Sequence, residues 1–479
     1  MAESTVQKLA LPALIAMVVG SMIGSGIFTL PSRFAGATGV YGALIAWAIA
    51  GGGMLMLAFV FQSLAARKPD IDSGIFAYAK YGFGEYWGFA AAIGFWLGTC
   101  VGNVSYWVLI KSTLGAFFPV FGDGNTLTAV IVASILVWCF HFLILRGVQG
   151  AAGINKIVTI AKVVPLLLFV VILLFNFDAS TFADNLWGGK DADKSFGTIW
   201  GQVRQTMLVT VFVFIGIEAA SVYSRYALKR EDVGRATVMG FFLVTSLMIA
   251  VSVLSFGVLP RADIALMRAP SVAGVMEAMV GPWGAKFISV GLIVSVLGAY
   301  LAWSLLAAEV PYLAAKYGLF PKYFEKTNEN KVPANALLMT NLVVQAFLIV
   351  TMFTQYAFQL SLELTSALTL IPYLLVAAYG LKLAMSGETY EKDPGARNKE
   401  LLIASIATFY ALLMIYSGGL KYVLLSALVF LPTTILFYNA RKGAGRKVFE
   451  TGPESVLFVV MVVGAAAALW AIASGRIVI

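Results

Sequence analysis

The strongest constraint on the fold is a succession of apolar segments, each about long enough to cross a lipid bilayer. Roughly 20 apolar residues of helix span the hydrocarbon core of a membrane. Lipid offers no partner to a free backbone N–H or C=O, so such segments are expected to be helices, giving an all-α integral membrane protein. We predict thirteen spans, near residues 11–34, 41–65, 86–116, 126–146, 154–176, 201–225, 236–259, 285–315, 335–354, 359–383, 401–418, 420–440 and 455–474.

Basic residues alternate between the loops and indicate the orientation of the chain. One set of loops is rich in lysine and arginine, as around Arg67 and Lys68 or Lys229 and Arg230, and the other set is poor in them. The positive-inside rule places the rich set and the N-terminus in the cytoplasm, and thirteen spans then place the C-terminus outside. A miscount of the two spans at 401–440 would return the C-terminus to the cytoplasm. No cleavable signal peptide is expected, because the first apolar segment runs on without an Ala-x-Ala pattern.

The first apolar segment contains a cluster of small residues between Gly20 and Gly26, followed by Pro31. Glycine weakens a helix and allows a ligand to approach the backbone. We predict a broken helix whose second half begins near Ser25, with free N–H groups and the positive end of a helix dipole available to a carboxylate. The alternative is close packing between helices through small residues.

The sixth apolar segment carries a second interruption, at Gly216, and an ionisable residue, Glu218, in mid-span. A carboxylate at this depth is costly and indicates a functional site. The alternative is a structural carboxylate that binds the amides of its own broken helix. Breaks in the first and sixth spans occupy equivalent places in two five-span halves, which is typical of transporters built from inverted repeats.

The remaining composition excludes several classes of function. Cys100 and Cys139 lie within apolar segments and have no metal-ligand or disulfide spacing. His141, the single histidine, is expected to be a buried helix residue, and neither a metal nor a cofactor is predicted. The net charge of +9 arises from loop residues and does not indicate nucleic-acid binding. No catalytic arrangement of side chains is present, so we do not expect an enzyme.

Several motifs resemble the amino acid–polyamine–organocation (APC) superfamily. The stretch from Gly24 to Pro31, GSGIFTLP, resembles its first-helix signature, and that from Phe214 to Val222, FIGIEAASV, resembles its sixth-helix signature. Trp303 with the following residues is similar to the eighth helix, and Gly102-Asn103 and Ile371-Pro372-Tyr373 match the third and tenth helices. The resemblance covers residues 10–440 and is greatest for the basic amino acid/polyamine antiporter branch, in particular for arginine/ornithine exchangers.

The resemblance implies a LeuT-like fold with a 5+5 inverted repeat. Residues 1–10 would be a cytoplasmic N-terminus, 11–176 and 201–383 the two repeats, and 401–474 three additional helices. The substrate carboxylate would bind the amides of Ser25 and Gly26, and its α-ammonium the carbonyls near Ile23, Phe212 and Ile215. The substrate side chain would lie along a further set of residues, namely Gly98, Thr99, Asn103, Trp303 and Thr365.

The resemblance also implies an inner gate formed by Phe95, Glu218 and Tyr373, with Phe212 and Trp303 closing over the substrate. Arginine/agmatine exchangers have tryptophan, tyrosine and serine where this chain has Phe212, Phe95 and Thr365. Phenylalanine keeps an aromatic face and loses the polar atom, so a hydrogen-bonding role for Phe95 is in doubt. The alternative for Trp303 is ordinary packing.

Two further charges lie within apolar segments, Lys162 and Glu309. A lysine that faces the core could occupy a sodium-like position between the first and eighth spans and make transport independent of sodium. Its alternative is to extend toward the cytoplasmic interface.

These observations predict a transporter of the bacterial inner membrane that exchanges basic amino acids, best matched by arginine for ornithine. Aromatic faces bind a cationic side chain by cation–π attraction, on the order of 1–2 kcal/mol when desolvated. The alternatives are a proton-coupled importer, a lysine or amino acid/amine exchanger, and a sensor that binds without transport. The partners expected are small-molecule substrates, the lipid bilayer and a second copy of the chain in a homodimer, without nucleic acid.

Overall fold

The computed structural model describes residues 10–71, 75–147, 152–188, 194–217, 228–354, 356–391 and 393–477. Within these ranges the regular structure is helical and no β-strand occurs, as the apolar segments predicted. The long helices are α3 (Val40–Arg67), α5 (Glu85–Gly115), α6 (Leu127–Leu145), α7 (Ala152–Phe175), α9 (Phe196–Phe214), α11 (Arg230–Val253), α14 (Pro282–Lys316), α15 (Ala334–Val350), α16 (Ala357–Ser386), α17 (Pro394–Gly443) and α18 (Gly452–Ala473). The shorter helices include α1 (Leu11–Met22), α2 (Leu30–Ala37), α4 (Ile75–Phe83), α8 (Ala179–Asp184), α12 (Arg261–Ala265) and α13 (Ser271–Val280).

Helix α5 lies at the centre of the bundle. Every residue from Gly88 to Thr113 is buried, which requires neighbours on all sides of the helix. Helices α14, α15, α16 and α4 pack against it. Small residues allow the closest approach: a Cβ at Gly94 would lie 2.7 Å from the Leu368 carbonyl oxygen of α16. The central helix therefore brings its own side chains next to those of α14 and α16.

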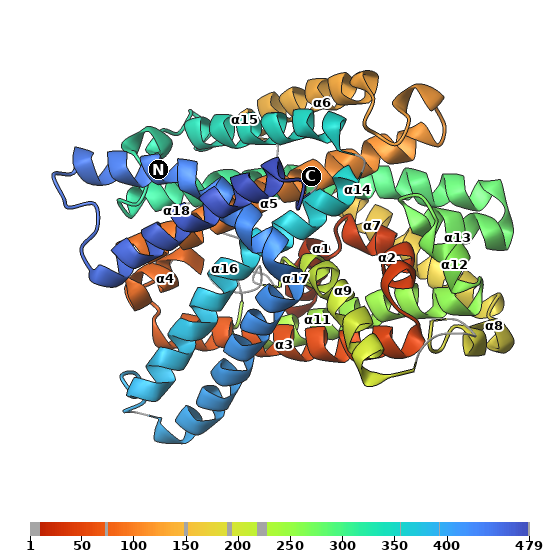
Figure 1. Cartoon of the computed structure of the whole chain (residues 1–479), viewed down its shortest axis with the longest axis horizontal. Helices are drawn as coiled ribbons and strands as arrows, with labels where there is room; N and C mark the ends of the chain where they lie inside the picture. Colours follow the sequence, from red (N-terminus) through yellow and green to blue (C-terminus); the bar gives the residue numbers. More distant parts are fainter. Residues whose placement is uncertain are drawn as a thin grey trace.

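The outer surface of the bundle is apolar. Helices α6 and α15 lie side by side along one edge of the molecule, and α6 exposes Leu127, Ile135 and Phe142 there (Figure 1). Among the described residues, nine helices are long and apolar enough to cross a membrane, and α1 with the segment after it forms a tenth, bent candidate. Large apolar side chains exposed over whole helices match a lipid environment, so the protein is a multi-pass membrane protein.

Each of the thirteen predicted segments contains a helix, with the end of 201–225 outside the described residues. The predicted spans 401–418 and 420–440 form the two halves of α17, which meet at Gly419 with φ 76° and ψ 169°. These values are not helical and suit glycine, so two helices join there. The exact number of spans and the repeat boundaries remain predictions.

Candidate functional site

The first span is broken where the sequence predicted. Helix α1 ends at Met22, and Ile23 has the extended dihedrals φ −78° and ψ 95°. Helical hydrogen bonding resumes with the short 3₁₀ helix Gly26–Thr29, which leads into α2. The axis of the second half is bent by 48° from that of the first half. Among the described residues, the N–H groups of Gly24, Ser25 and Gly26 have no backbone partner. The break thus provides a group of free donors beside a helix N-terminus, which suits an anion.

The sixth span is also broken, next to the break in the first span. Helix α9 ends at Phe214, Ile215 leaves the helical region with ψ 129°, and Gly216 adopts φ 111°. A Cβ at Gly216 would lie 2.7 Å from the Ser21 carbonyl oxygen, so only glycine fits between the two chain breaks. The Ser21 hydroxyl donates a 3.0 Å hydrogen bond to the Gly216 carbonyl. The two interrupted helices are therefore held together at their ends.

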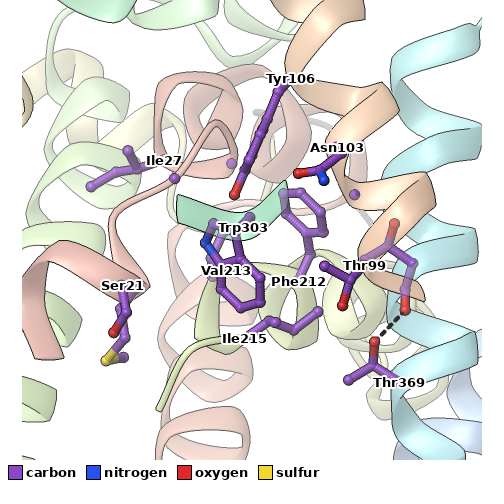
Figure 2. Close-up of a pocket in the computed structure, with 15 residues that line it drawn as sticks. Ser21, Ile27, Thr99, Asn103, Tyr106, Phe212, Val213, Ile215, Trp303 and Thr369 are labelled. Atoms are coloured by element: carbon purple, nitrogen blue, oxygen red, sulfur yellow. Dashed lines mark hydrogen bonds between the residues drawn. The ribbon is translucent and has the colours of Figure 1, made fainter. Parts of the chain in front are cut away.

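A cavity lies where these breaks meet α5, α14 and α16 (Figure 2). Its lining consists of Ser21, Met22, Gly24, Gly26, Ile27, Thr99, Gly102, Asn103, Tyr106, Phe212, Val213, Ile215, Trp303, Thr365 and Thr369. No carboxylate or cationic side chain is among these described residues. The volume is about 30 Å³, which is room for a few water molecules at most and too little for an amino acid. Phe212 and Trp303 are each 9% exposed and occupy the centre of the site in Figure 2, so an amino acid needs them to move aside.

Seven of the ten substrate-binding residues predicted from the sequence line this cavity, namely Gly26, Thr99, Asn103, Phe212, Ile215, Trp303 and Thr365. The structure places the other three just outside it. Ile23 and Ser25 lie in the break itself, where both are buried. Gly98 packs against α16, where a Cβ would lie 2.7 Å from the Thr369 hydroxyl oxygen. The substrate-binding roles of all ten residues remain predictions.

The predicted gating residues lie at different distances from the cavity. Phe95 is one turn from Thr99 on α5, and its carbonyl accepts a 2.7 Å hydrogen bond from the Thr99 hydroxyl. Tyr373 is fully buried on α16, with its ring edge-on to Phe61 at 6.1 Å. Glu218 lies outside the described residues. The gating roles of these residues therefore remain predictions.

Lys162 points inward toward the break. Its side chain is 5% exposed, and its Nζ donates a 2.6 Å hydrogen bond to the Gly20 carbonyl in the last turn of α1. An ammonium group at this position faces the negative end of the helix dipole. The alternative of a side chain that extends to the membrane interface does not match this geometry.

Sequence reasoning missed Tyr106 and Thr369, which also line the cavity. A Cβ at Gly24 would lie 3.0 Å from the Tyr106 hydroxyl oxygen, so this hydroxyl faces the broken first span. Helical spacing could have found both residues, because Tyr106 lies seven positions after Thr99 and Thr369 four positions after Thr365. The Thr369 hydroxyl donates to the Thr365 carbonyl at 2.8 Å, drawn as a dashed line in Figure 2.

Two buried acceptors in the cavity lack partners among the described residues. They are Asn103 Oδ1 and Thr365 Oγ1. Buried polar atoms are normally hydrogen-bonded, so such atoms in a cavity indicate a ligand group or water. The site therefore combines amide donors at one end with neutral acceptors and aromatic faces at the other. That combination suits a molecule with a carboxylate and a cationic group.

Comparison with known proteins gives a consistent result. The model of a family described as amino acid permease matches residues 9–438. The chain is 50% identical to an arginine/ornithine antiporter of Pseudomonas aeruginosa, with 99% of each chain covered. It is 39% identical to an L-lysine transport protein of Corynebacterium glutamicum, covering 99% of this chain and 97% of that protein.

One solved structure supports the fold by its arrangement of helices. It is a Na⁺-coupled sialic acid symporter in a substrate-bound outward-open state, with a TM-score of 0.52 and 13% sequence identity. The match covers 86% of this chain and 89% of that one. The predicted LeuT-like fold is thereby confirmed.

Proposed function

Because the chain belongs to the amino acid permease family of membrane transporters, we propose that it exchanges arginine for ornithine by alternating access. The observation that carries the proposal is the cavity at the two helix breaks, which combines free amide donors with an aromatic and neutral polar region. The 50% identity to a protein named as an arginine/ornithine antiporter supports the choice of substrates.

The amides at the first break would bind the substrate carboxylate. The N–H groups of Ser25 and Gly26 precede the second half of the span, where the helix dipole favours an anion. A Cβ at Gly26 would lie 2.6 Å from Val213 Cγ1, so the absence of a side chain allows this backbone to pack directly against α9. The α-ammonium would bind carbonyls at Ile23, Phe212 and Ile215, near the C-terminal ends of α1 and α9.

The cationic side chain of the substrate would lie between Trp303 and the two unpartnered acceptors, Asn103 Oδ1 and Thr365 Oγ1. A planar guanidinium stacks on an aromatic face, and both guanidinium and ammonium groups donate to neutral oxygens. Without a carboxylate in the described lining, a cation is held by dipoles and ring faces alone. Such binding is weak enough for release, which favours exchange.

Phe95, Glu218 and Tyr373 would form the inner gate, and Phe212 and Trp303 would close over the bound substrate. The proposal also places the protein in the bacterial inner membrane as a homodimer. Its N-terminus would be cytoplasmic and its C-terminus external. A lysine exchanger is the second candidate, favoured by the 39% identity to an L-lysine transport protein.

Counterflow in proteoliposomes tests the proposal. Purified protein is reconstituted into vesicles loaded with ornithine, lysine, agmatine or buffer, and uptake of labelled arginine is followed without sodium. We expect uptake into ornithine-loaded vesicles to be at least about tenfold faster than into empty ones, because a loaded site resets faster than an empty one. Equal uptake into loaded and empty vesicles would exclude obligate exchange. Faster counterflow with lysine than with ornithine would favour the second candidate.

A further inference from the structure

The single histidine of the chain is turned into the bundle. Helix α6 exposes Ile135 and Phe142 on its outer face, whereas His141 is 5% exposed and faces α15. Its Nδ1 lies 3.0 Å from the side-chain nitrogen of Asn341. A polar contact between two membrane helices, buried among apolar side chains, has no water to replace it, so its hydrogen-bonding roles are fixed by the protein.

The partners of Asn341 determine those roles. Asn341 is 1% exposed, and its Oδ1 accepts a 3.4 Å hydrogen bond from the hydroxyl of Tyr300 on α14. The amide nitrogen can therefore only donate toward His141, and His141 Nδ1 must accept.

The chain of contacts continues from Tyr300 to the cavity. Ser304 lies one turn after Tyr300 on the same face of α14, and the Tyr300 hydroxyl lies beside the side chain of Ser304. The Ser304 hydroxyl accepts a 3.4 Å hydrogen bond from Asn103 Nδ2. Asn103, 1% exposed, lines the cavity from α5, where Figure 2 shows its carboxamide above Phe212 and Thr99.

This arrangement determines which atom of Asn103 faces the substrate. With Nδ2 donating to Ser304, Oδ1 is left as the unpartnered atom of the carboxamide at the cavity. An oxygen attracts a guanidinium or ammonium group, whereas an amide nitrogen in its place would present hydrogens to that cation. Rotation of the carboxamide by 180° would thus convert an attractive contact into a repulsive one.

We propose that His141 is a positioning residue for the substrate site, which acts through Asn341, Tyr300 and Ser304 to hold the Asn103 carboxamide with its oxygen toward the cationic end of the substrate. The proposal rests on the proposed exchange of basic amino acids. Loss of the His141 acceptor leaves the Asn341 amide free to turn, which removes the acceptor for Tyr300 and releases Ser304 and Asn103 in succession. The effect is on affinity for the cation and not on the fold.

The chain offers a matched control between the same two helices. The Ser134 hydroxyl of α6 accepts a 2.8 Å hydrogen bond from Gln345 Nε2 of α15, two turns from His141, and neither residue lines the cavity. Ser134→Ala and His141→Leu each remove one hydrogen bond between α6 and α15. Only His141→Leu interrupts the connection to Asn103. In His141→Asn, the amide oxygen takes the place of Nδ1 and restores the acceptor.

The experiment measures the KM and maximal rate of arginine/ornithine exchange in proteoliposomes, with arginine binding by calorimetry. We expect His141→Leu to raise the KM and Kd for arginine about tenfold, the scale of a lost hydrogen bond to a charged group, with little change in maximal rate. His141→Asn should return both constants toward the wild-type values, and Ser134→Ala should leave them unchanged.

The outcomes separate this proposal from the proposed function. If the wild-type protein exchanges arginine but His141→Leu binds it as Ser134→Ala does, the positioning role is wrong and the exchange function stands. If His141→Leu does not fold, Tyr300→Phe, which lacks only the hydroxyl, should raise the KM to a similar extent. An unchanged KM in that variant also overturns the proposal.

Discussion

The Nζ of Lys162 lies 2.6 Å from the carbonyl oxygen of Gly20, at the last turn of α1 before the first span breaks. A cationic side chain thereby stabilises the C-terminal end of a half-helix, where the dipole is negative and the carbonyls lack helical partners. A bound cation could otherwise fill this position. The Lys162 ammonium group would take the place of that cation, which is the physical basis of the proposed sodium independence.

Lys162→Met should slow exchange by about tenfold or more, because the half-helix end loses its counter-charge. Initial rates of arginine uptake into ornithine-loaded vesicles measure the effect, with and without sodium. Lys382→Met is the control, since Lys382 Nζ also donates to a backbone carbonyl, that of Gly82 at 2.7 Å, and does not reach the break. A Lys162→Met protein that exchanges at the wild-type rate would contradict the role, as would strict sodium dependence of the wild type.

Gly26→Ala should weaken substrate binding by about tenfold or more, because its Cβ would lie 2.6 Å from Val213 Cγ1 and 2.9 Å from Phe212 Cδ1 and push the breaks apart. Calorimetric titration with arginine measures the loss. Gly20→Ala is the matched control: nothing lies within 4 Å of its Cβ, and alanine stabilises a helix by up to about 1 kcal/mol relative to glycine. Equal affinities in the two variants would exclude a tight contact at Gly26.

Trp303→Leu should weaken arginine binding by about 1–2 kcal/mol, the scale of a desolvated cation–π contact. The loss should be greater for arginine than for its neutral analogue citrulline, because only arginine carries the charge. Binding to both ligands is compared with that of Trp470→Leu on α18, where the side chain is 58% exposed on the outer surface. Equal losses for the two ligands would indicate that Trp303 acts by packing alone.

Glu218→Gln should retain measurable substrate binding and slow exchange by about an order of magnitude, since a mid-span carboxylate is expected to couple occupancy to gate closure. Glu218→Asp should slow it as well, because its shorter side chain cannot span the same gate. Calorimetry in detergent and counterflow in liposomes are performed on the same purified variants. Normal exchange by Glu218→Gln would show that the carboxylate has a structural role and that the gate lies elsewhere.

The sequence by itself determined the elements and the two interruptions. Long apolar segments in lipid can only be helices, and a cluster of small residues around Gly24 weakens one of them, so the break needed no tertiary information. The same holds for α9, which ends at Phe214, because the sequence already placed the second interruption at Gly216, where glycine weakens the helix. The family resemblance also identified seven of the fifteen residues that line the cavity.

Only the tertiary structure decided which side chains meet across helices. Lys162 is 142 positions from Gly20. Its side chain reaches Gly20 only because α7 turns the face that carries Lys162 toward the interior of the bundle. The pattern of apolar residues does not specify this rotation for a helix in lipid. Gly98 packs against α16 and Tyr106 reaches the break because helix rotation and crossing fix their neighbours. The route from His141 to Asn103 joins four helices through single hydrogen bonds, and no spacing in the chain encodes it. The apolar faces of a helix are nearly equivalent in lipid, so packing and buried polar contacts determine which face turns toward the interior of the bundle.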